Sequence, residues 1–254
     1  MWDKRAEEFD RSTKERSHRT ERQVASLQLD PDCTVLDVGA GTGRLSVPIA
    51  KMVKKVTAVD QSRGMLNYLE ENMAEEGLSN YRCIQKRWED VRLGEDIEAH
   101  DVVIASHSLG MFDLQEALAK MDAAAKRRVY IFTAAGKWFF DDFEEELWER
   151  IYDRPPRRGR GGGFRSDYMI LYNILHDMGI YANVEIRDAE HVQRYESLDE
   201  AVERWKLSRE IPEESEPLLR EYLAKNLESE NGGGLTFRRR TKGAMIWWSK
   251  SESS

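Results

Sequence analysis

The chain has 254 residues, of which 40% are hydrophobic and 34% charged, and its formal net charge is −8 at pH 7, as in a folded acidic protein with a sizeable core. This balance disfavours a general nucleic-acid binder, because neutralising phosphates favours a basic surface. No signal-peptide pattern or apolar run of about twenty residues occurs, and Cys33 and Cys83 lack metal-ligand spacing, so we expect a cytoplasmic protein without a membrane span, a disulfide framework or a metal site.

Residues 1–30 are expected to form an N-terminal helical segment. Beyond it, apolar segments with strand character alternate with segments of helical periodicity. The expected strands are 33–38, 55–60, 81–85, 101–105 and 128–133, and the expected helices between them are 43–53, 62–76 and 114–125. Strands separated by helices form parallel units with right-handed crossovers. The pattern therefore predicts a doubly wound, mostly parallel α/β sheet.

The second half of the chain shows a looser pattern. Helices are expected at 137–152 and 166–178, on either side of a loop at 153–163 that is rich in proline, glycine and arginine. The alternation in 181–188 predicts a sixth strand. An acid-rich stretch, 189–234, contains two amphipathic helices, and the segment 235–250 reads as a closing strand or hairpin.

Three glycines, Gly39, Gly41 and Gly43, follow the first expected strand. They let the backbone turn sharply and bring peptide N–H groups close to a ligand. A phosphate-binding P-loop requires Lys and then Ser or Thr after its last glycine, and a dinucleotide fingerprint requires glycine at position 44. Arg44 occupies this position instead, so the sequence lacks a residue that each of these two kinds of site requires.

The stretch LDVGAGTG, with Asp37 before the glycines, resembles the first motif of the class I S-adenosylmethionine-dependent methyltransferases, D-x-G-x-G-x-G. Asp60, at the end of the second expected strand, is similar in position to the family's acid that binds both ribose hydroxyls. The resemblance extends over about 33–133. It implies a seven-stranded Rossmann-like sheet, completed by 166–178, 181–188 and 242–248. It also implies a methyltransferase domain over 31–254 with cap insertions at about 137–163 and 189–234.

The resemblance implies S-adenosyl-L-methionine as the cofactor and S-adenosyl-L-homocysteine as its product. The cofactor-binding residues that it implies are Asp37, Gly39, Ala40, Gly41, Gly43, Asp60, Gln61, Met65, Trp88, Glu89 and Ser106. The adenine contacts depart from the family, because Arg87 and Trp88 occupy the places of an acid and a small residue. An arginine cannot accept the adenine amino protons. We expect Glu89 or a backbone carbonyl to take that role, with Trp88 stacked on the ring or beside it.

Candidates for the substrate side follow the fourth and fifth expected strands. His107 is the candidate general base, and the alternative is a histidine that donates a structural hydrogen bond. The aromatic run 138–140 either lines a substrate pocket or packs a cap helix against the sheet. In the N-terminal segment, Trp2 and Phe9 either close over the cofactor or anchor their helix.

The loop 154–165 contains five arginines, Arg154, Arg157, Arg158, Arg160 and Arg165. They either contact an anionic substrate or RNA phosphates, or balance the acidic helix next to them. The leading hypothesis is a methyltransferase acting on a small or medium-sized metabolite. An RNA or protein methyltransferase that uses this loop is the first alternative, and a non-catalytic S-adenosylmethionine-binding subunit is the second. The sequence predicts no oligomeric state.

Overall fold

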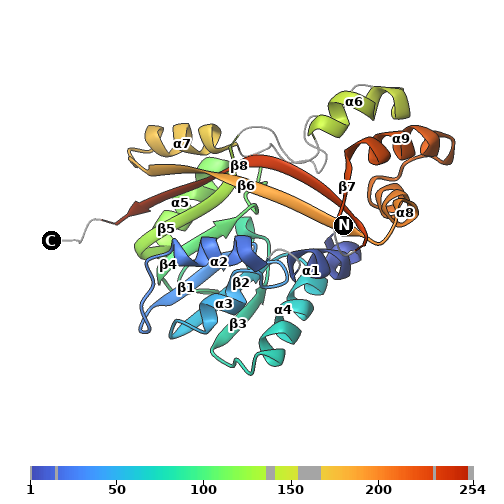
Figure 1. Cartoon of the computed structure of the whole chain (residues 1–254). Helices are drawn as coiled ribbons and strands as arrows, with labels where there is room; N and C mark the ends of the chain where they lie inside the picture. Colours follow the sequence, from blue (N-terminus) through green and yellow to red (C-terminus); the bar gives the residue numbers. More distant parts are fainter. Residues whose placement is uncertain (1, 15–16, 136–140, 154–166, 231–232, 251–254) are drawn as a thin grey trace. The chain divides into compact units, whose positions relative to one another are not determined.

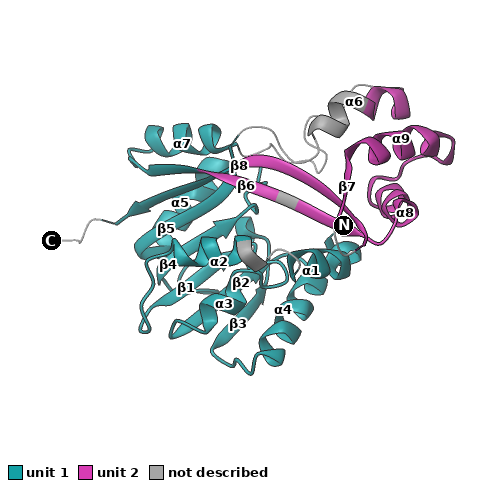
Figure 2. Ribbon diagram, in the orientation of Figure 1, with its two compact units in different colours: residues 1–135, 162–186, 243–254 teal, residues 136–161, 187–242 magenta. Residues whose placement is uncertain are grey.

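The computed structural model describes residues 2–14, 17–135, 141–153, 167–230 and 233–250. The chain divides into two compact units (Figure 2). Unit 1 comprises Met1–Ala135, Gly162–Ile186 and Gly243–Ser254, and unit 2 comprises Gly136–Gly161 and Arg187–Lys242. In the described ranges, no helix combines the length and the apolar character needed to cross a membrane.

The predicted mostly parallel sheet is confirmed (Figure 1). Its five parallel strands are β1 (Thr34–Val38), β2 (Lys55–Asp60), β3 (Tyr81–Gln85), β4 (His100–Ser106) and β5 (Ala125–Ala134). They lie in the order β3-β2-β1-β4-β5. Next come β8 (Leu235–Ser249), which is antiparallel to β5, and then β6 (Asn183–Tyr195). A short strand, β7 (Leu227–Ser229), pairs with β8 outside this order of seven.

Helices cover both faces of the sheet in unit 1 (Figure 1). One face packs against α3 (Ser46–Ala50) and α4 (Arg63–Glu75), and the other against α5 (Leu114–Ala124) and α7 (Tyr168–Asp177). Each face has its own apolar cluster. In β1, Val35 packs in the cluster on the α3 and α4 side, and Leu36 packs in the cluster on the α5 and α7 side. A strand that is buried on both faces is typical of a parallel sheet between two helical layers. The N-terminal segment adds η1 (Trp2–Arg5), α1 (Ala6–Lys14) and α2 (Ser17–Ala25).

Two predicted elements have different bounds in the structure. The helix expected at 43–53 is shorter in the structure, where α3 spans only Ser46–Ala50. Gly43 cannot belong to it, because its φ of +87° is left-handed and no α-helical residue adopts such an angle. The strand expected at 181–188 extends to Tyr195, so residues 189–195 are strand rather than part of a helical insertion. The long neighbouring strand β8 supplies backbone partners for this extension, whereas the alternation of side chains breaks down around 187–190.

Unit 2 contains α6 (Asp141–Tyr152), α8 (Leu198–Arg209), η3 (Glu213–Ser215) and α9 (Glu216–Asn226). Both helices expected within 189–234 are therefore present. Their core surrounds Trp205, which is 1% exposed and donates its indole N–H to the Tyr195 hydroxyl at 2.7 Å. The proposal that these segments cap a binding site stays a prediction.

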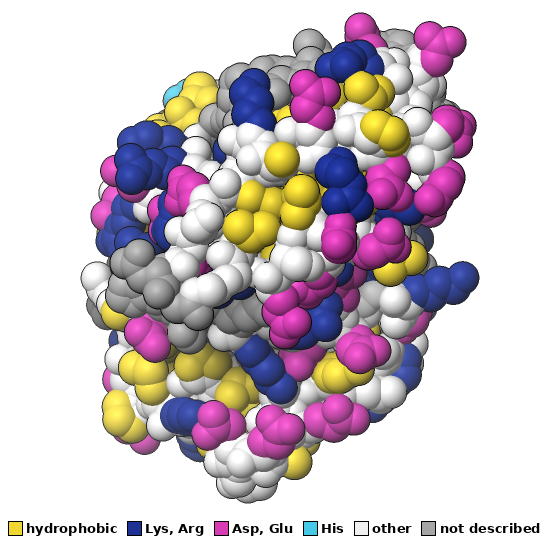
Figure 3. All heavy atoms as spheres, turned by 45° about the vertical axis from the view of Figure 1, so that its right-hand side comes forward, with side chains coloured by type: hydrophobic (Ala, Val, Ile, Leu, Met, Phe, Trp, Pro, Cys, Tyr) yellow, Lys and Arg dark blue, Asp and Glu magenta, His cyan; other side chains and the backbone are white. Residues whose placement is uncertain are grey.

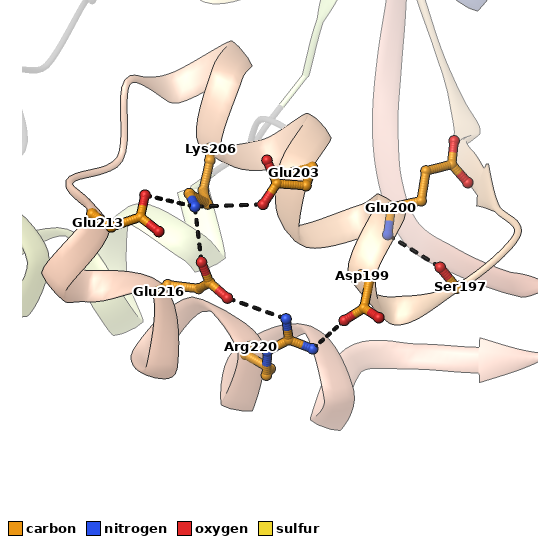
Figure 4. A network of polar contacts seen from close by, with 8 residues as sticks. All are labelled: Ser197, Asp199, Glu200, Glu203, Lys206, Glu213, Glu216 and Arg220. Carbon is orange, nitrogen blue, oxygen red and sulfur yellow. Dashed lines mark hydrogen bonds and ion pairs between the residues drawn. The ribbon is translucent and has the colours of Figure 1, made fainter.

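Charged side chains connect α8 to η3 and α9 on the surface of unit 2 (Figure 4). The Lys206 ammonium lies 2.8 Å from carboxylate oxygens of both Glu213 and Glu216. Arg220 contacts Glu216 at 3.1 Å and Asp199 at 2.5 Å. These ion pairs link α8 to η3 and α9.

Candidate functional site

The glycine loop joins the C-terminal end of β1 to α3. Gly39, Gly41 and Gly43 all have left-handed φ angles, of +73°, +58° and +87°. A Cβ on Gly39 would lie 2.2 Å from the Cβ of Ser108, and a Cβ on Gly43 would lie 2.9 Å from the Cγ of Leu69. Glycine is therefore required at 39 and 43 both by backbone conformation and by space.

Asp60 ends β2 opposite this loop. One oxygen of its carboxylate accepts the N–H of Gly41 and the other accepts the N–H of Ser62, both at 2.9 Å. Burial raises the pKa of Asp60, and these two backbone donors oppose the rise. Each carboxylate oxygen has a second lone pair, so the group can also accept two hydroxyl donors at once.

Asp37 lies in β1, just before the loop. Its side chain is buried and accepts a hydrogen bond from the Ser46 hydroxyl at 2.6 Å. Burial raises the pKa of Asp37 to about 6, whereas the Ser46 hydrogen bond and the nearby charge of Arg44 lower it. This hydrogen bond links β1 to the first residue of α3.

The residues predicted for the adenine differ in exposure. Gln61 is exposed, and Met65 is buried in the first turn of α4. Trp88 belongs to the hydrophobic core and donates its indole N–H to the carbonyl of Ala117 at 3.1 Å. Core packing and this hydrogen bond therefore fix the position of the Trp88 ring. Its contact with a cofactor stays a prediction.

Glu89 is partly exposed, unlike the buried Trp88 beside it. Arg87, which replaces the acid of the family pattern, donates to its carboxylate at 2.8 Å. Although burial opposes the effect, the backbone N–H of Glu89 and the Arg87 guanidinium lower the pKa of Glu89. Lys120 donates to the carbonyls of Trp88 and Glu89 at 3.2 and 2.7 Å, which fixes the turn after β3.

The N-terminal segment is anchored next to the glycine loop and α4. A carboxylate oxygen of Asp3 accepts the hydroxyl of Ser62 and the N–H of Gly64, both at 2.8 Å. Phe9 packs 3.4 Å from the position that a Cβ on Gly41 would occupy, and the Trp2 ring meets Phe9 edge to face at 6.1 Å. These contacts support the anchoring role of Trp2 and Phe9. Closure over a cofactor stays a prediction.

The end of β4 carries Ser106, His107 and Ser108. His107 has a left-handed φ of +54°, and its N–H donates to the carbonyl of Phe132 at 2.9 Å. The Arg19 guanidinium contacts Nε2 of His107. A guanidinium only donates hydrogen bonds, so a hydrogen bond between these two groups requires Nε2 as its acceptor.

Hydrogen bonds and close packing connect three strand ends at one edge of the sheet. Gly41 joins the β1 loop to Asp60 of β2, Arg44 donates to the Ser106 hydroxyl of β4 at 2.7 Å, and Ser108 donates to the Val38 carbonyl at 2.5 Å. The aromatic run 138–140 and the arginine loop 154–165 lie outside the described residues.

The sequence did not reveal several residues of this edge: Asp3, Arg19, Arg44, Ser108 and Lys120. Arg44 carried one usable signal, because it directly follows the last glycine of the motif. The other four contact the loop or its neighbours from distant positions in the chain, and no local pattern marks them.

Comparisons with known proteins agree with this geometry. Residues 35–128 match the family model described as a methyltransferase domain. An uncharacterised protein of Haemophilus influenzae is 30% identical over 252 residues, which cover 97% of this chain and 88% of the relative. The fold is similar to the YcgJ protein of Bacillus subtilis, with a TM-score of 0.62 at 16% identity over 93% of this chain and 99% of the other.

A second similar structure is magnesium protoporphyrin IX methyltransferase from Synechocystis with bound S-adenosylhomocysteine. Its TM-score is 0.55 at 16% identity, over 93% of this chain and 83% of the other. The family match and the order of the strands lead to the same assignment. The chain belongs to the class I S-adenosylmethionine-dependent methyltransferases.

Proposed function

We propose that the protein binds S-adenosyl-L-methionine at the glycine loop and transfers its methyl group to a small or medium-sized metabolite, leaving S-adenosyl-L-homocysteine. The observation that carries this proposal is the position of the loop. The strand order reverses between β1 and β4, and ligands of open α/β sheets bind at the carboxyl ends of the strands at such a switch point.

The residues at this edge fit the adenosyl part of the cofactor. The Asp60 carboxylate can accept both hydroxyls of a ribose while it keeps its bonds to Gly41 and Ser62. The glycines let the loop turn tightly at the end of β1, beside the Asp60 carboxylate. We propose that the adenine lies among Gln61, Met65, Trp88 and Glu89. Glu89 accepts a hydrogen bond from the adenine amino group.

The cofactor, when bound, supplies a methyl group activated by the sulfonium. The protein then has to align the acceptor and exclude water, and it needs a base only when the acceptor carries a proton. We propose that Ser106 lies beside the cofactor and that His107 faces the acceptor from the end of β4. His107 acts as a base through Nε2 only when that nitrogen is not engaged by Arg19.

Two observations support a metabolite as the methyl acceptor. The similar Synechocystis protein is named for a porphyrin substrate, which is a metabolite. On the face shown in Figure 3, acidic and basic side chains are interspersed, unlike the single-sign basic surface that favours a nucleic acid. The cytoplasmic location stays a prediction.

Binding and transfer test the proposal in two steps. Isothermal titration with S-adenosylhomocysteine is expected to show binding to the wild type and at least about tenfold weaker binding to Asp60→Asn, because a hydrogen-bonded carboxylate is lost from the ribose. Asp32→Asn is the matched control, since Asp32 is an exposed acid outside the site. Equal affinity in all three proteins would contradict the assignment of Asp60.

Transfer is then followed with methyl-labelled cofactor in a cell extract. Label in the small-molecule filtrate is the expected result. Label in RNA or protein would instead support the alternative acceptor classes, and tight binding without any transfer would identify a non-catalytic binding subunit.

A further inference from the structure

Two arginines converge on the end of β4 from different parts of unit 1. Arg19 comes from α2 and contacts Nε2 of His107. Arg44 follows the glycine loop and donates to the hydroxyl of Ser106 at 2.7 Å. Because Ser106 and His107 are adjacent, the two guanidinium groups flank the same strand end, on which the proposed acceptor would lie.

Neutral oxygens help to hold Arg44 in this position. Besides Ser106, it donates to the hydroxyl of Thr20 at 3.2 Å and to the side-chain carbonyl of Gln23 at 2.6 Å. Thr20 is the neighbour of Arg19, so the same turn of α2 positions both arginines. Oriented by such contacts, Arg44 loses less conformational freedom when it binds a ligand.

The charge near this strand end also favours an anion. Arg44 is half-buried, which weakens screening by water. Burial raises the pKa of Asp37, an acid near Arg44, to about 6, so Asp37 offsets the charge of Arg44 less below that pH than above it. A planar guanidinium matches the two oxygens of a carboxylate, and two guanidinium groups strengthen that preference.

We propose that Arg19 and Arg44 form a carboxylate-binding site at the C-terminal end of β4, an inference that rests on the proposed methyl transfer. The carboxylate belongs either to the amino-acid end of the methyl donor or to the methyl acceptor. In both cases it competes with Nε2 of His107 for the Arg19 guanidinium. Binding of the carboxylate therefore changes the hydrogen bonding of Nε2, the nitrogen through which we propose that His107 acts as a base.

The first arm of the test compares two cofactor analogues. S-adenosylhomocysteine carries the amino-acid carboxylate, and 5′-methylthioadenosine lacks it. Both are titrated into the wild type, Arg19→Gln, Arg44→Gln and Arg44→Lys, with Arg22→Gln as control, because Arg22 is an exposed arginine on the same helix as Arg19. A donor carboxylate predicts at least about tenfold weaker S-adenosylhomocysteine binding in the glutamine variants, with methylthioadenosine unchanged.

The second arm addresses the acceptor. Sodium acetate is added to the wild type saturated with S-adenosylhomocysteine, with sodium chloride at the same ionic strength as reference, and the ¹⁵N signals of the His107 ring are recorded. An acceptor carboxylate predicts a saturable shift of Nε2 with acetate that is absent in Arg19→Gln. His107→Gln identifies the signal, and thermal unfolding verifies that each variant is folded.

Either of these responses supports the carboxylate site and names its source. If the glutamine variants weaken both analogues equally or neither, and acetate shifts the His107 signal no more than chloride does, the site is overturned. A wild-type protein that binds neither analogue would contradict the proposed function itself, which is a different result from loss of discrimination in the variants.

Discussion

The glycine-loop edge of unit 1 and the helical cluster of unit 2 both contain many charged side chains, but in different surroundings. In unit 1, burial raises the pKa of Asp37 and Asp60, so ionisation of these acids opposes folding. In unit 2, contacts with Lys206 and Arg220 lower the pKa of Glu216, and contacts with Glu213 and Glu216 raise the pKa of Lys206. The strands beside the loop thus carry desolvated acids that a binding site can use, whereas the charged groups of unit 2 stabilise one another's ionised forms.

The core of unit 2 should give the largest effect on stability. Trp205→Ala removes a side chain that is 1% exposed and packs against Phe237 at 4.9 Å between ring centroids. We expect the free energy of unfolding to fall by about 4 kcal/mol, measured by denaturant titration. Leu207→Ala, in the same helix but 80% exposed, should change it by less than about 0.5 kcal/mol. Similar losses in both variants would show that Trp205 is not a core residue.

A single methyl group added to the glycine loop should lower the free energy of unfolding. Gly39→Ala places a Cβ 2.2 Å from that of Ser108 at a left-handed φ, and we expect a loss of about 3 kcal/mol. Gly77→Ala is the control, because its φ is also left-handed but no atom lies within 4 Å of the added Cβ. It should lose about 1 kcal/mol. An equal loss in both would rule out the close packing of the loop on Ser108.

Asp37 should make stability fall as pH rises. Its pKa is about 6 in the folded chain against the usual 3.8, so both states are protonated below 3.8 and the full penalty is present only above 6. The difference in unfolding free energy between the wild type and Asp37→Asn should therefore shift in favour of the variant by up to roughly 3 kcal/mol from pH 4 to 8.

Taking this difference at each pH removes the contribution of groups that both proteins share, such as His100, whose pKa is lowered by burial. A difference that does not vary with pH would contradict the desolvated state of Asp37.

The ion pairs of unit 2 should give the smallest effect. Lys206→Met removes the centre of the network in Figure 4, and we expect a loss of stability that is smaller than those of the variants above and that decreases at high salt. Glu221→Gln, an exposed change on α9, serves as the control. A loss as large as that of Trp205→Ala would reverse the comparison between core and surface.

The sequence predicted the first half of the fold because its signals are local. Strands β1 to β5 are short apolar runs, and α4 shows its buried face in the spacing of Met65, Leu66, Leu69 and Met73. The glycine motif likewise lies within one stretch of the chain. Residues that follow one another directly set these features, so no knowledge of distant contacts was needed.

The remaining features depend on contacts between distant residues. The extension of β6 is supported by β8, about fifty residues later, and cannot be read from its own broken alternation. Asp3 accepts hydrogen bonds from Ser62 and Gly64, and Arg19 contacts His107 across 88 positions. The sequence therefore predicted the cofactor motif but not the polar contacts that surround it.

The central claim is that Asp60 and the glycine loop bind the adenosyl group of the methyl donor. A crystal structure of the protein with S-adenosylhomocysteine tests it most directly. We predict that both ribose hydroxyls donate to the Asp60 carboxylate, with the sulfur towards the end of β4. A nucleoside bound elsewhere, or with its ribose away from Asp60, would contradict the account.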